Sequence, residues 1–186
     1  MFIRSERLFL RPGWPEDWQE LLAGIGDEAV VRNLAKAPWP YTADDARSFA
    51  GKPQDSRLPH FFVTLPSSSA PARIIGSVGL GRNEDGAVEL GYWIARAHWG
   101  RGFATEAVRG VLSLARTLGH RIITAGHFSD NPASARVLAK TGFKPTGEVR
   151  PRFCLSRGAR IPAVVHAAAL GEPSDCDGGD MVARAA

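Results

Sequence analysis

The residues whose spacing most clearly indicates chemistry are Gly100 and Gly102, which separate an apolar segment from an amphipathic one. The preceding segment, residues 88–95, is mainly apolar and aromatic, which is typical of a strand. After the glycines, apolar residues recur at helical spacing from Ala104 onward. Glycine lets a ligand approach bare amides, and the first turn of a helix offers unpaired N–H groups. This order predicts a cradle for a phosphate or pyrophosphate. The alternative is that the glycines only make a tight turn.

The sequence around these glycines closely resembles the acetyl-CoA loop of the GNAT-type N-acetyltransferases, most of all the branch that contains the ribosomal-protein N-terminal acetyltransferases. The matching residues are Leu90-Gly91-Tyr92-Trp93-Ile94 and His98-Trp99-Gly100-Arg101-Gly102-Phe103-Ala104-Thr105-Glu106-Ala107. The family loop reads Gln/Arg-x-x-Gly-x-Gly/Ala, and Trp99 departs from its first position. The resemblance implies acetyl-CoA as co-substrate, without a metal. The pyrophosphate would be held at Arg101, Gly102, Phe103, Ala104 and Thr105.

A second segment, residues 130–143, resembles the family motif Asn-x-x-Ser followed by Lys-x-Gly-Phe. The resemblance implies that Asn131 binds the pantetheine arm, that Ser134 protonates the leaving thiolate, and that Lys140 reaches a CoA phosphate. Each residue also has a simpler interpretation. Asn131 can cap a helix, Ser134 can pack in the first helical turn, and Lys140 can be a solvated side chain.

Glu89 is the candidate general base, because an ammonium must lose a proton before it attacks a thioester. In related enzymes a glutamate on this strand often has that role. The alternative is an outward-facing carboxylate paired with an arginine. The resemblance also implies that backbone amides near a strand bulge, around Trp93 and Ile94, polarise the thioester carbonyl. No motif for a covalent acyl-enzyme is present, and the five histidines lack metal-ligand spacing.

The acceptor site is predicted near the aromatic loop at residues 37–41, because the first helices wall this site in the family. Trp39 and Tyr41 are the candidate substrate contacts, and a hydrophobic plug between helices is the other interpretation. The predicted activity is transfer of acetyl to a primary amine, with a peptide or protein N-terminal α-amine as acceptor. The alternatives are a small-molecule amine or aminoglycoside, and a CoA-binding or ribosome-associated module without turnover.

The periodicities predict an α/β domain with a mixed sheet over residues 1–170. The resemblance implies the GNAT fold for it, a mixed, mostly antiparallel twisted sheet flanked by helices. An edge strand is expected at Arg7–Arg11, and further strands are expected at residues 60–65, 73–80, 87–95, 121–127, 143–154 and 161–170. Helices are expected from Pro15, over Asp27–Leu34, after Thr42, after Gly102 and after Asn131. Residues 171–186 lack periodicity and are predicted to be a disordered tail.

Composition agrees with a folded domain: the chain has 186 residues, of which 44% are apolar, and a formal net charge of +4. No apolar run reaches the length of a membrane span, and the N-terminus lacks a signal-peptide core. We therefore expect a cytoplasmic protein, monomeric or homodimeric, without a membrane partner. No basic run with interleaved aromatics appears, so nucleic-acid binding is not required. Cys154 is expected to be a packed thiol and Cys176 a loose one, since their spacing fits no metal or redox motif.

Overall fold

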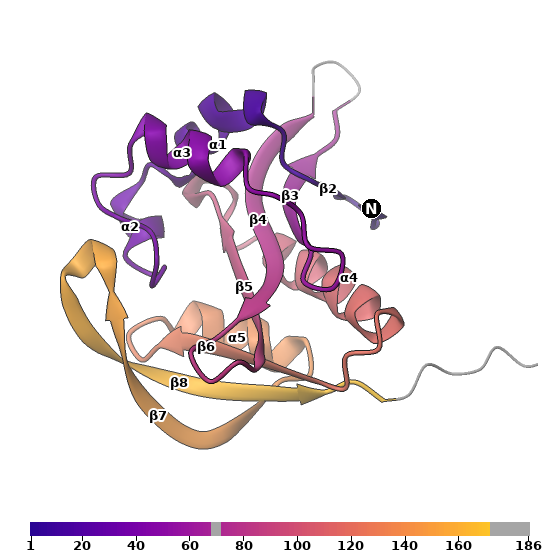
Figure 1. Ribbon diagram of the computed structural model, residues 1–186, viewed down its shortest axis with the longest axis vertical. Helices are drawn as coiled ribbons and strands as arrows, with labels where there is room; N and C mark the ends of the chain where they lie inside the picture. The colour runs from indigo at the N-terminus through magenta and orange to yellow at the C-terminus, as the bar shows by residue number, and fades with distance from the viewer. Residues whose placement is uncertain (68–71, 172–186) are drawn as a thin grey trace, which may run out of the picture.

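The computed structural model describes residues 1–67 and 72–171, which form an eight-stranded sheet flanked by helices (Figure 1). The strands are β1 Ile3–Arg4, β2 Phe9–Arg11, β3 His60–Leu65, β4 Arg73–Arg82, β5 Val88–Ile94, β6 Ile122–Phe128, β7 Lys144–Cys154 and β8 Ala159–Ala169. The helices are α1 Trp18–Ile25, α2 Glu28–Val31, α3 Ala43–Ala50, α4 Phe103–Thr117 and α5 Pro132–Lys140, with short 3-10 turns at Pro15–Asp17, Arg96–His98 and Leu155–Arg157. The sheet order is β1-β2-β3-β4-β5-β6-β8-β7. This mixed, mostly antiparallel sheet confirms the predicted fold class.

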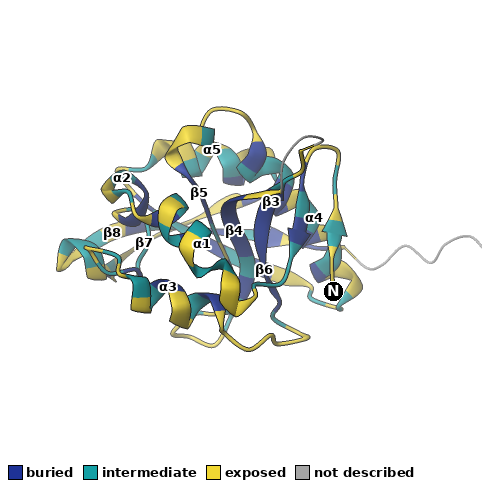
Figure 2. Cartoon of the chain, turned by 90° about the horizontal axis from the view of Figure 1, so that it is seen from above, coloured by how far each residue is buried: buried dark blue, intermediate teal, exposed yellow. Residues whose placement is uncertain are grey.

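Two apolar cores lie on opposite faces of the sheet. Successive side chains of a strand point to opposite faces, and the neighbours Phe61 and Phe62 of β3 accordingly belong to different cores. The larger core packs α4 and α5 against the sheet, and the smaller core packs α1 and α3 against the other face. Figure 2 shows the result, with buried central strands and exposed outer sides of the helices.

Strands β5 and β6 are parallel and pair over a very short length. Their register consists of Glu89 opposite Thr124 and Leu90 opposite Ala125. Beyond these pairs β5 continues to Ile94 and β6 to Phe128, and the two strands no longer pair with each other. The strands therefore separate toward their C-terminal ends, the edge at which α4 and α5 begin.

Helix α4 connects β5 to β6 and forms where the sequence predicts it. Its 15 residues bury one stripe against the larger core, formed by Phe103, Ala107, Val108, Val111, Leu112 and Ala115. Gly119 follows with a φ of 81°, the left-handed conformation that commonly ends a helix.

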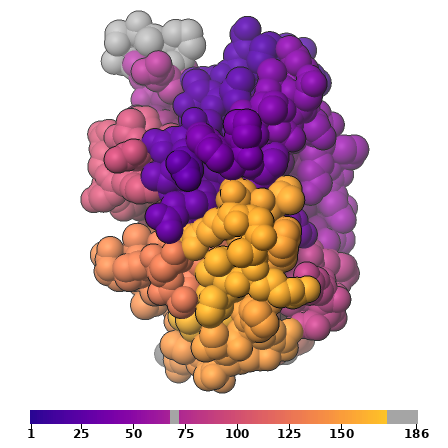
Figure 3. Space-filling model, turned by 90° about the vertical axis from the view of Figure 1, so that its left-hand side faces the viewer, coloured from indigo at the N-terminus to yellow at the C-terminus, as the bar shows by residue number. Residues whose placement is uncertain are grey.

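The β7–β8 hairpin docks its tip against the chain after α2, on the far side of the molecule from α4. The Leu155 amide donates to the Ala35 carbonyl at 2.9 Å, and Arg157 Nε donates to the Arg32 carbonyl at 2.8 Å. Cys154 is buried there, which agrees with the prediction of a packed thiol. In Figure 3 the yellow-orange hairpin lies directly against the indigo and purple N-terminal region.

The short elements near the N-terminus differ from those predicted from the sequence. The segment predicted as the edge strand is not the edge, because β1 pairs outside β2. The helix expected over Asp27–Leu34 is shorter; Asp27 is the N-cap of α2, which ends at Val31. The predicted disordered tail and Cys176 lie outside the described residues, apart from Gly171. Among the described residues no helix is long and apolar enough to cross a membrane.

Candidate active site

The predicted anion cradle is formed at the N-terminus of α4. Gly100 and Gly102 have φ values of 73° and 79°, a left-handed conformation that side chains rarely adopt. Gly102 is the N-cap and supplies no side chain to cap the helix; the Glu106 amide makes the first helical bond, to the Gly102 carbonyl at 3.1 Å. Among the described residues, the amides of Phe103, Ala104 and Thr105 therefore have no acceptor. Three aimed donors and the helix dipole fit a pyrophosphate.

Trp99, which departs from the family loop pattern, fixes the cradle to β5. Its indole Nε1 donates to the carbonyl of Ile94 at 2.6 Å. This hydrogen bond ties the start of the loop to the last residue of the strand. The side chain at the first position of the motif therefore has a structural function here.

Arg7 holds the cradle from the opposite side. Its guanidinium donates to the Arg101 carbonyl at 3.0 Å and to Glu106 in the first turn of α4 at 2.8 Å. Glu106 also accepts hydrogen bonds from the Arg7 amide at 2.8 Å and from Ser5 Oγ at 2.7 Å. We call Ser5, Arg7 and Glu106 the clasp. Burial raises the pKa of Glu106, but these hydrogen bonds and the Arg7 charge outweigh burial and hold it below its ordinary value.

We expect Glu106→Gln to lower the free energy of unfolding at pH 7 by about 1.5–3 kcal/mol, the usual contribution of a hydrogen bond to a charged group. Because the folded-state pKa lies below the ordinary value of 4.5, the stabilisation is fully present above that value and is lost as pH falls through the folded-state pKa. Denaturant unfolding at pH 7 and at pH 3 measures this. The exposed Glu84→Gln is the control, and a Glu106→Gln deficit that does not shrink at pH 3 would contradict the assignment.

Strand β5 presents different residues to its two faces. Tyr92 and Ile94 point toward the larger core and α5, whereas Trp93 points toward the smaller core and α1. Glu89 lies four residues from Trp93 and thus shares its face. The candidate base and the cradle helix are therefore on opposite faces of one strand, at the point where β5 and β6 separate.

Glu89 forms an ion pair with Arg152 of β7. Arg152 Nη2 donates to Glu89 Oε1 at 2.6 Å, and the Arg152 and Glu89 side chains are 34% and 20% exposed. The pairing with an arginine that the sequence left open is therefore present. It does not remove Glu89 from consideration as a base, because Oε2 has no hydrogen-bond partner among the described residues.

On the other face, Tyr92 and Ser134 form a hydroxyl pair with an O···O distance of 2.6 Å. Burial raises the pKa of Tyr92 to about 12, and the hydrogen bond with Ser134 offsets this rise only in part. The phenol therefore keeps its proton at neutral pH. The sequence predicts a role for Ser134 but not for Tyr92, because the two residues are 42 positions apart in the chain.

Asn131 caps α5 as its simpler interpretation predicts, since its Oδ1 accepts from the Ser134 amide at 3.1 Å. Its Nδ2 has no acceptor among the described residues, so a ligand can still bind there. Lys140 ends α5 and is exposed, and its carbonyl accepts from Arg109 Nη2 at 3.3 Å. Ligand roles for Asn131 and Lys140 remain predictions.

The backbone amides of Trp93 and Ile94 are not equivalent. In an antiparallel ladder, alternate residues bond to the neighbouring strand. The Ala95 amide donates to the Ile75 carbonyl of β4, so Trp93 also faces β4 and Ile94 faces the gap toward β6. The register between β4 and β5 is uninterrupted from Gly76 to Arg82. The expected bulge is therefore not present between these strands. Of the two amides, that of Ile94 remains the candidate for polarising the thioester carbonyl.

Comparison with known proteins identifies the family. Residues 7–144 match the model of the acetyltransferase (GNAT) domain. The chain belongs to the GNAT family of acetyltransferases. A relative from Bacillus subtilis, named Probable N-acetyltransferase YjcK, is 42% identical over 161 residues, covering 80% of this chain and 86% of the relative. The enzyme class predicted from the sequence, a GNAT-type N-acetyltransferase, is confirmed.

Solved structures of GNAT proteins share the fold. An acetyltransferase from Bacillus anthracis superposes with a TM-score of 0.76 at 21% identity, covering 91% of this chain and 98% of that one. Spermidine N-acetyltransferase from Vibrio cholerae, in complex with CoA and spermine, has a TM-score of 0.71 at 21% identity and covers 89% and 96% of the two chains. At this level of identity the likeness describes the fold and leaves the acceptor open.

The two aromatic candidates for the acceptor side of this GNAT chain differ in their surroundings. Tyr41 packs against the smaller core and its hydroxyl donates to the Asp45 carbonyl of α3 at 3.4 Å. Burial, with a smaller effect of Asp45, raises its pKa to about 12. Trp39 is 41% exposed. Trp39 is thus the more accessible of the two, and a substrate role for either remains a prediction.

Proposed function

We propose that this GNAT acetyltransferase moves the acetyl group directly from acetyl-CoA to a primary amine, and that the amine is the α-amine of a peptide or protein N-terminus. The observation that carries the proposal is that β5 lies between groups suited to bind the donor and a group suited to deprotonate the acceptor. The free amides of α4 and the Tyr92–Ser134 pair are on one side, and the Glu89 carboxylate is on the other. Between the two sides, β5 and β6 stop pairing after Leu90 and Ala125.

The donor would be held mainly by backbone. The amides of Phe103, Ala104 and Thr105 supply donors for the pyrophosphate. Because Trp99 and Arg7 already fix the loop, ligand binding does not have to order it, and little conformational entropy is lost. Asn131 Nδ2 is available to an amide carbonyl of the pantetheine arm, and Lys140 to a phosphate. This arrangement is typical of anion binding at a helix N-terminus.

The acceptor amine must be neutral to attack, and Glu89 supports this step. Its Oε2 has no hydrogen-bond partner in the part of the chain that the structure describes, and its side chain is partly exposed on the face away from α4. A carboxylate in that position can take a proton from an ammonium directly or through one water. Because Arg152 holds Oε1, the orientation of the carboxylate is already fixed.

The carbonyl and the leaving group need two further contributions. The Ile94 amide faces the gap and can stabilise a developing oxyanion. A thiolate that leaves toward α5 can take the Ser134 hydroxyl proton, which Tyr92 can replace across their 2.6 Å hydrogen bond. The high pKa of Tyr92, about 12, keeps this donor protonated at neutral pH.

The assignment of the acceptor is supported by charge and by the sequence resemblance to the ribosomal-protein branch. A guanidinium 2.6 Å from Glu89 opposes the binding of a polycation, because a second ammonium would lie close to a like charge. An N-terminal α-amine carries one positive charge only. The exposed Trp39 indole offers an aromatic surface for an extended chain.

Acetylation of matched peptides tests the proposal. The protein is incubated with acetyl-CoA and one peptide sequence, free or blocked at its N-terminus, and with spermidine and an aminoglycoside. We expect CoA thiol release and a single added acetyl group only on the free N-terminus. Labelling of spermidine or the aminoglycoside alone would overturn the N-terminal assignment. Absence of CoA release with every amine would overturn the enzymatic proposal in favour of a CoA-binding module.

A further inference from the structure

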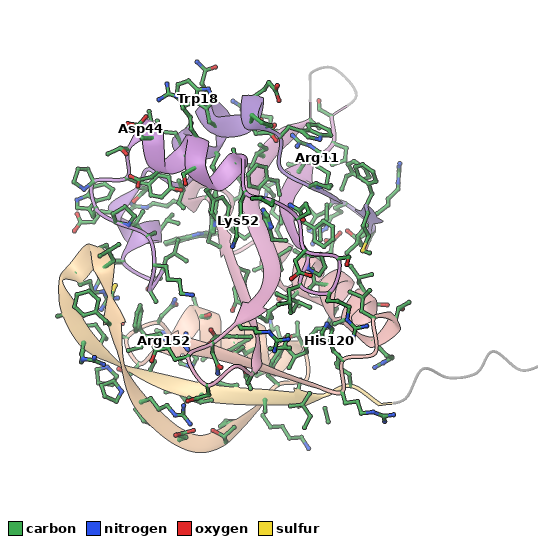
Figure 4. The ribbon with its side chains drawn as sticks, viewed as in Figure 1. Arg11, Trp18, Asp44, Lys52, His120 and Arg152 are labelled. Carbon is green, nitrogen blue, oxygen red and sulfur yellow. The ribbon has the colours of Figure 1, made fainter. Side chains whose placement is uncertain are left out.

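The guanidinium of Arg152 lies at the candidate base, although Arg152 belongs to an edge strand. Arg152 belongs to β7, an edge strand whose side chains are mostly exposed, and β8 and β6 lie between β7 and β5 in the sheet order; its guanidinium nevertheless reaches Glu89 of β5. Figure 4 shows Arg152 between the β7–β8 hairpin and strands β5 and β6. Its charge therefore lies at the candidate base and not in bulk solvent.

The other arginines of this hairpin differ in their partners. Arg150 pairs with Asp85 and Glu148, and Arg157 pairs with Asp130. The pairs with Asp85 and Asp130 join surface segments that the fold brings together, whereas Glu148 is a neighbour of Arg150 on the same strand. Arg152 is the hairpin arginine whose carboxylate partner is the candidate base.

The Arg152–Glu89 pair leaves some of its hydrogen-bonding groups unused, and both side chains are partly exposed to solvent. Arg152 donates a hydrogen bond to Glu89 Oε1 through one nitrogen, Nη2. Among the described residues, its other guanidinium N–H groups and Glu89 Oε2 have no partner. A guanidinium presents a planar set of donors that fits a carboxylate or phosphate in two-point fashion. One acceptor oxygen and several donors are thus free, side by side.

Gly126 of β6 keeps the space beside the pair open. A Cβ at this position would lie 3.4 Å from Arg152 Nη1 and 3.6 Å from Glu89 Oε1. A larger side chain there would extend along the two charged groups. With glycine, the backbone of β6 forms a side-chain-free surface next to the ion pair, where a ligand group can contact both residues.

We propose that Arg152 binds an anionic group that the acceptor carries close to its amine. The inference rests on the proposed function, in which Glu89 receives the amine. The acceptor that fits is zwitterionic, with its ammonium at Glu89 Oε2 and its carboxylate or phosphate at the free donors of Arg152. The anionic group can be the α-carboxylate of a free amino acid or the acidic side chain at the start of a peptide. Arg152 thereby selects the acceptor and also orients its amine toward the base.

The experiment compares acceptors that differ only in the anion. Peptides Asp-Ala-Ala-Ala and Asn-Ala-Ala-Ala test the side-chain source, alanine and alaninamide test the α-carboxylate source, and spermidine is the polycation. Initial rates of CoA thiol release give kcat/KM for each. We expect at least a tenfold preference for the acidic member of one pair, expressed mainly in KM. Equal kcat/KM within both pairs would overturn the inference, as would a preference for spermidine.

Variants separate substrate selection from a structural role of Arg152. Arg152→Gln retains a donor for Glu89 but removes the charge, and should abolish the acid-to-amide preference. Arg150→Gln, the same change two residues away on the same strand, is the control and should keep it. Arg152→Lys should restore part of the preference, because the charge returns without the planar donors. A preference that survives Arg152→Gln would contradict the proposal.

A second readout does not depend on turnover. The N-acetylated form of the preferred acidic acceptor should raise the Tm of the wild type and of Arg150→Gln, and should not raise that of Arg152→Gln. If no acceptor is turned over, the enzymatic proposal fails. Equal Tm shifts in all three proteins, or none in any of them with every acetylated acid used, would overturn the anion site independently.

Discussion

Replacement of Glu89 by glutamine should reduce kcat by roughly 10²–10⁴-fold, the usual contribution of a general base. The substitution keeps the shape of the side chain, and the new amide oxygen can still accept the hydrogen bond from Arg152. Affinity for CoA should be almost unchanged, because Glu89 lies on the face of β5 away from the α4 amides. Single-turnover acetylation and calorimetric titration with CoA measure the two effects separately.

Glu148→Gln is the matched control for this variant. Glu148 is an exposed β7 carboxylate that pairs with Arg150, so its neutralisation removes the same charge near the hairpin without touching β5. We expect this variant to retain the wild-type rate. Full turnover by Glu89→Gln at neutral pH would show that another group, or water alone, deprotonates the amine.

The elements around the cradle could be predicted from the sequence because their patterns are local. The helical spacing after Gly102 and the apolar run before Gly100 each lie within one segment, and the structure confirms both. Strand β1 could not be found in the same way. It has two residues, too few for an alternating pattern, and it is held by pairing with β2.

The partners of the site residues could not be predicted, because they are distant in the chain. Tyr92 and Ser134 are 42 residues apart, and Arg152 and Glu89 are 63 apart. Glu106 illustrates the limit best. It lies off the apolar stripe of α4, a place typical of a surface side chain, and nothing in the local sequence indicates that Ser5 and Arg7 enclose it. The sequence also could not indicate which residues of β5 face which core, since apolar residues occupy both faces of this strand.

Substitution at the cradle should abolish or greatly weaken CoA binding. Gly102 adopts a φ of 79°, where a β-branched residue is strongly disfavoured. Gly102→Val should shift the loop and move the first amides of α4. We expect the Kd for CoA to rise by roughly 10- to 100-fold, which corresponds to about 1.4–2.8 kcal/mol. Gly119→Val is the control, since Gly119 has a φ of 81° at the other end of the same helix and faces open space.

Ala104→Asp provides the sharper test, because it should weaken CoA binding without a large loss of stability. A carboxylate in the first turn of α4 interacts favourably with the helix dipole, which contributes roughly 0.3–1 kcal/mol. The same charge would occupy the field that a pyrophosphate needs. Ala104 also packs partly against the larger core, which offsets the gain from the helix dipole. The variant should therefore unfold at about the denaturant concentration of the wild type, while calorimetry detects little or no CoA binding. Undiminished affinity in this stable variant would place the CoA phosphates elsewhere. A loss of affinity without a loss of stability is the result expected for a site at the amides themselves.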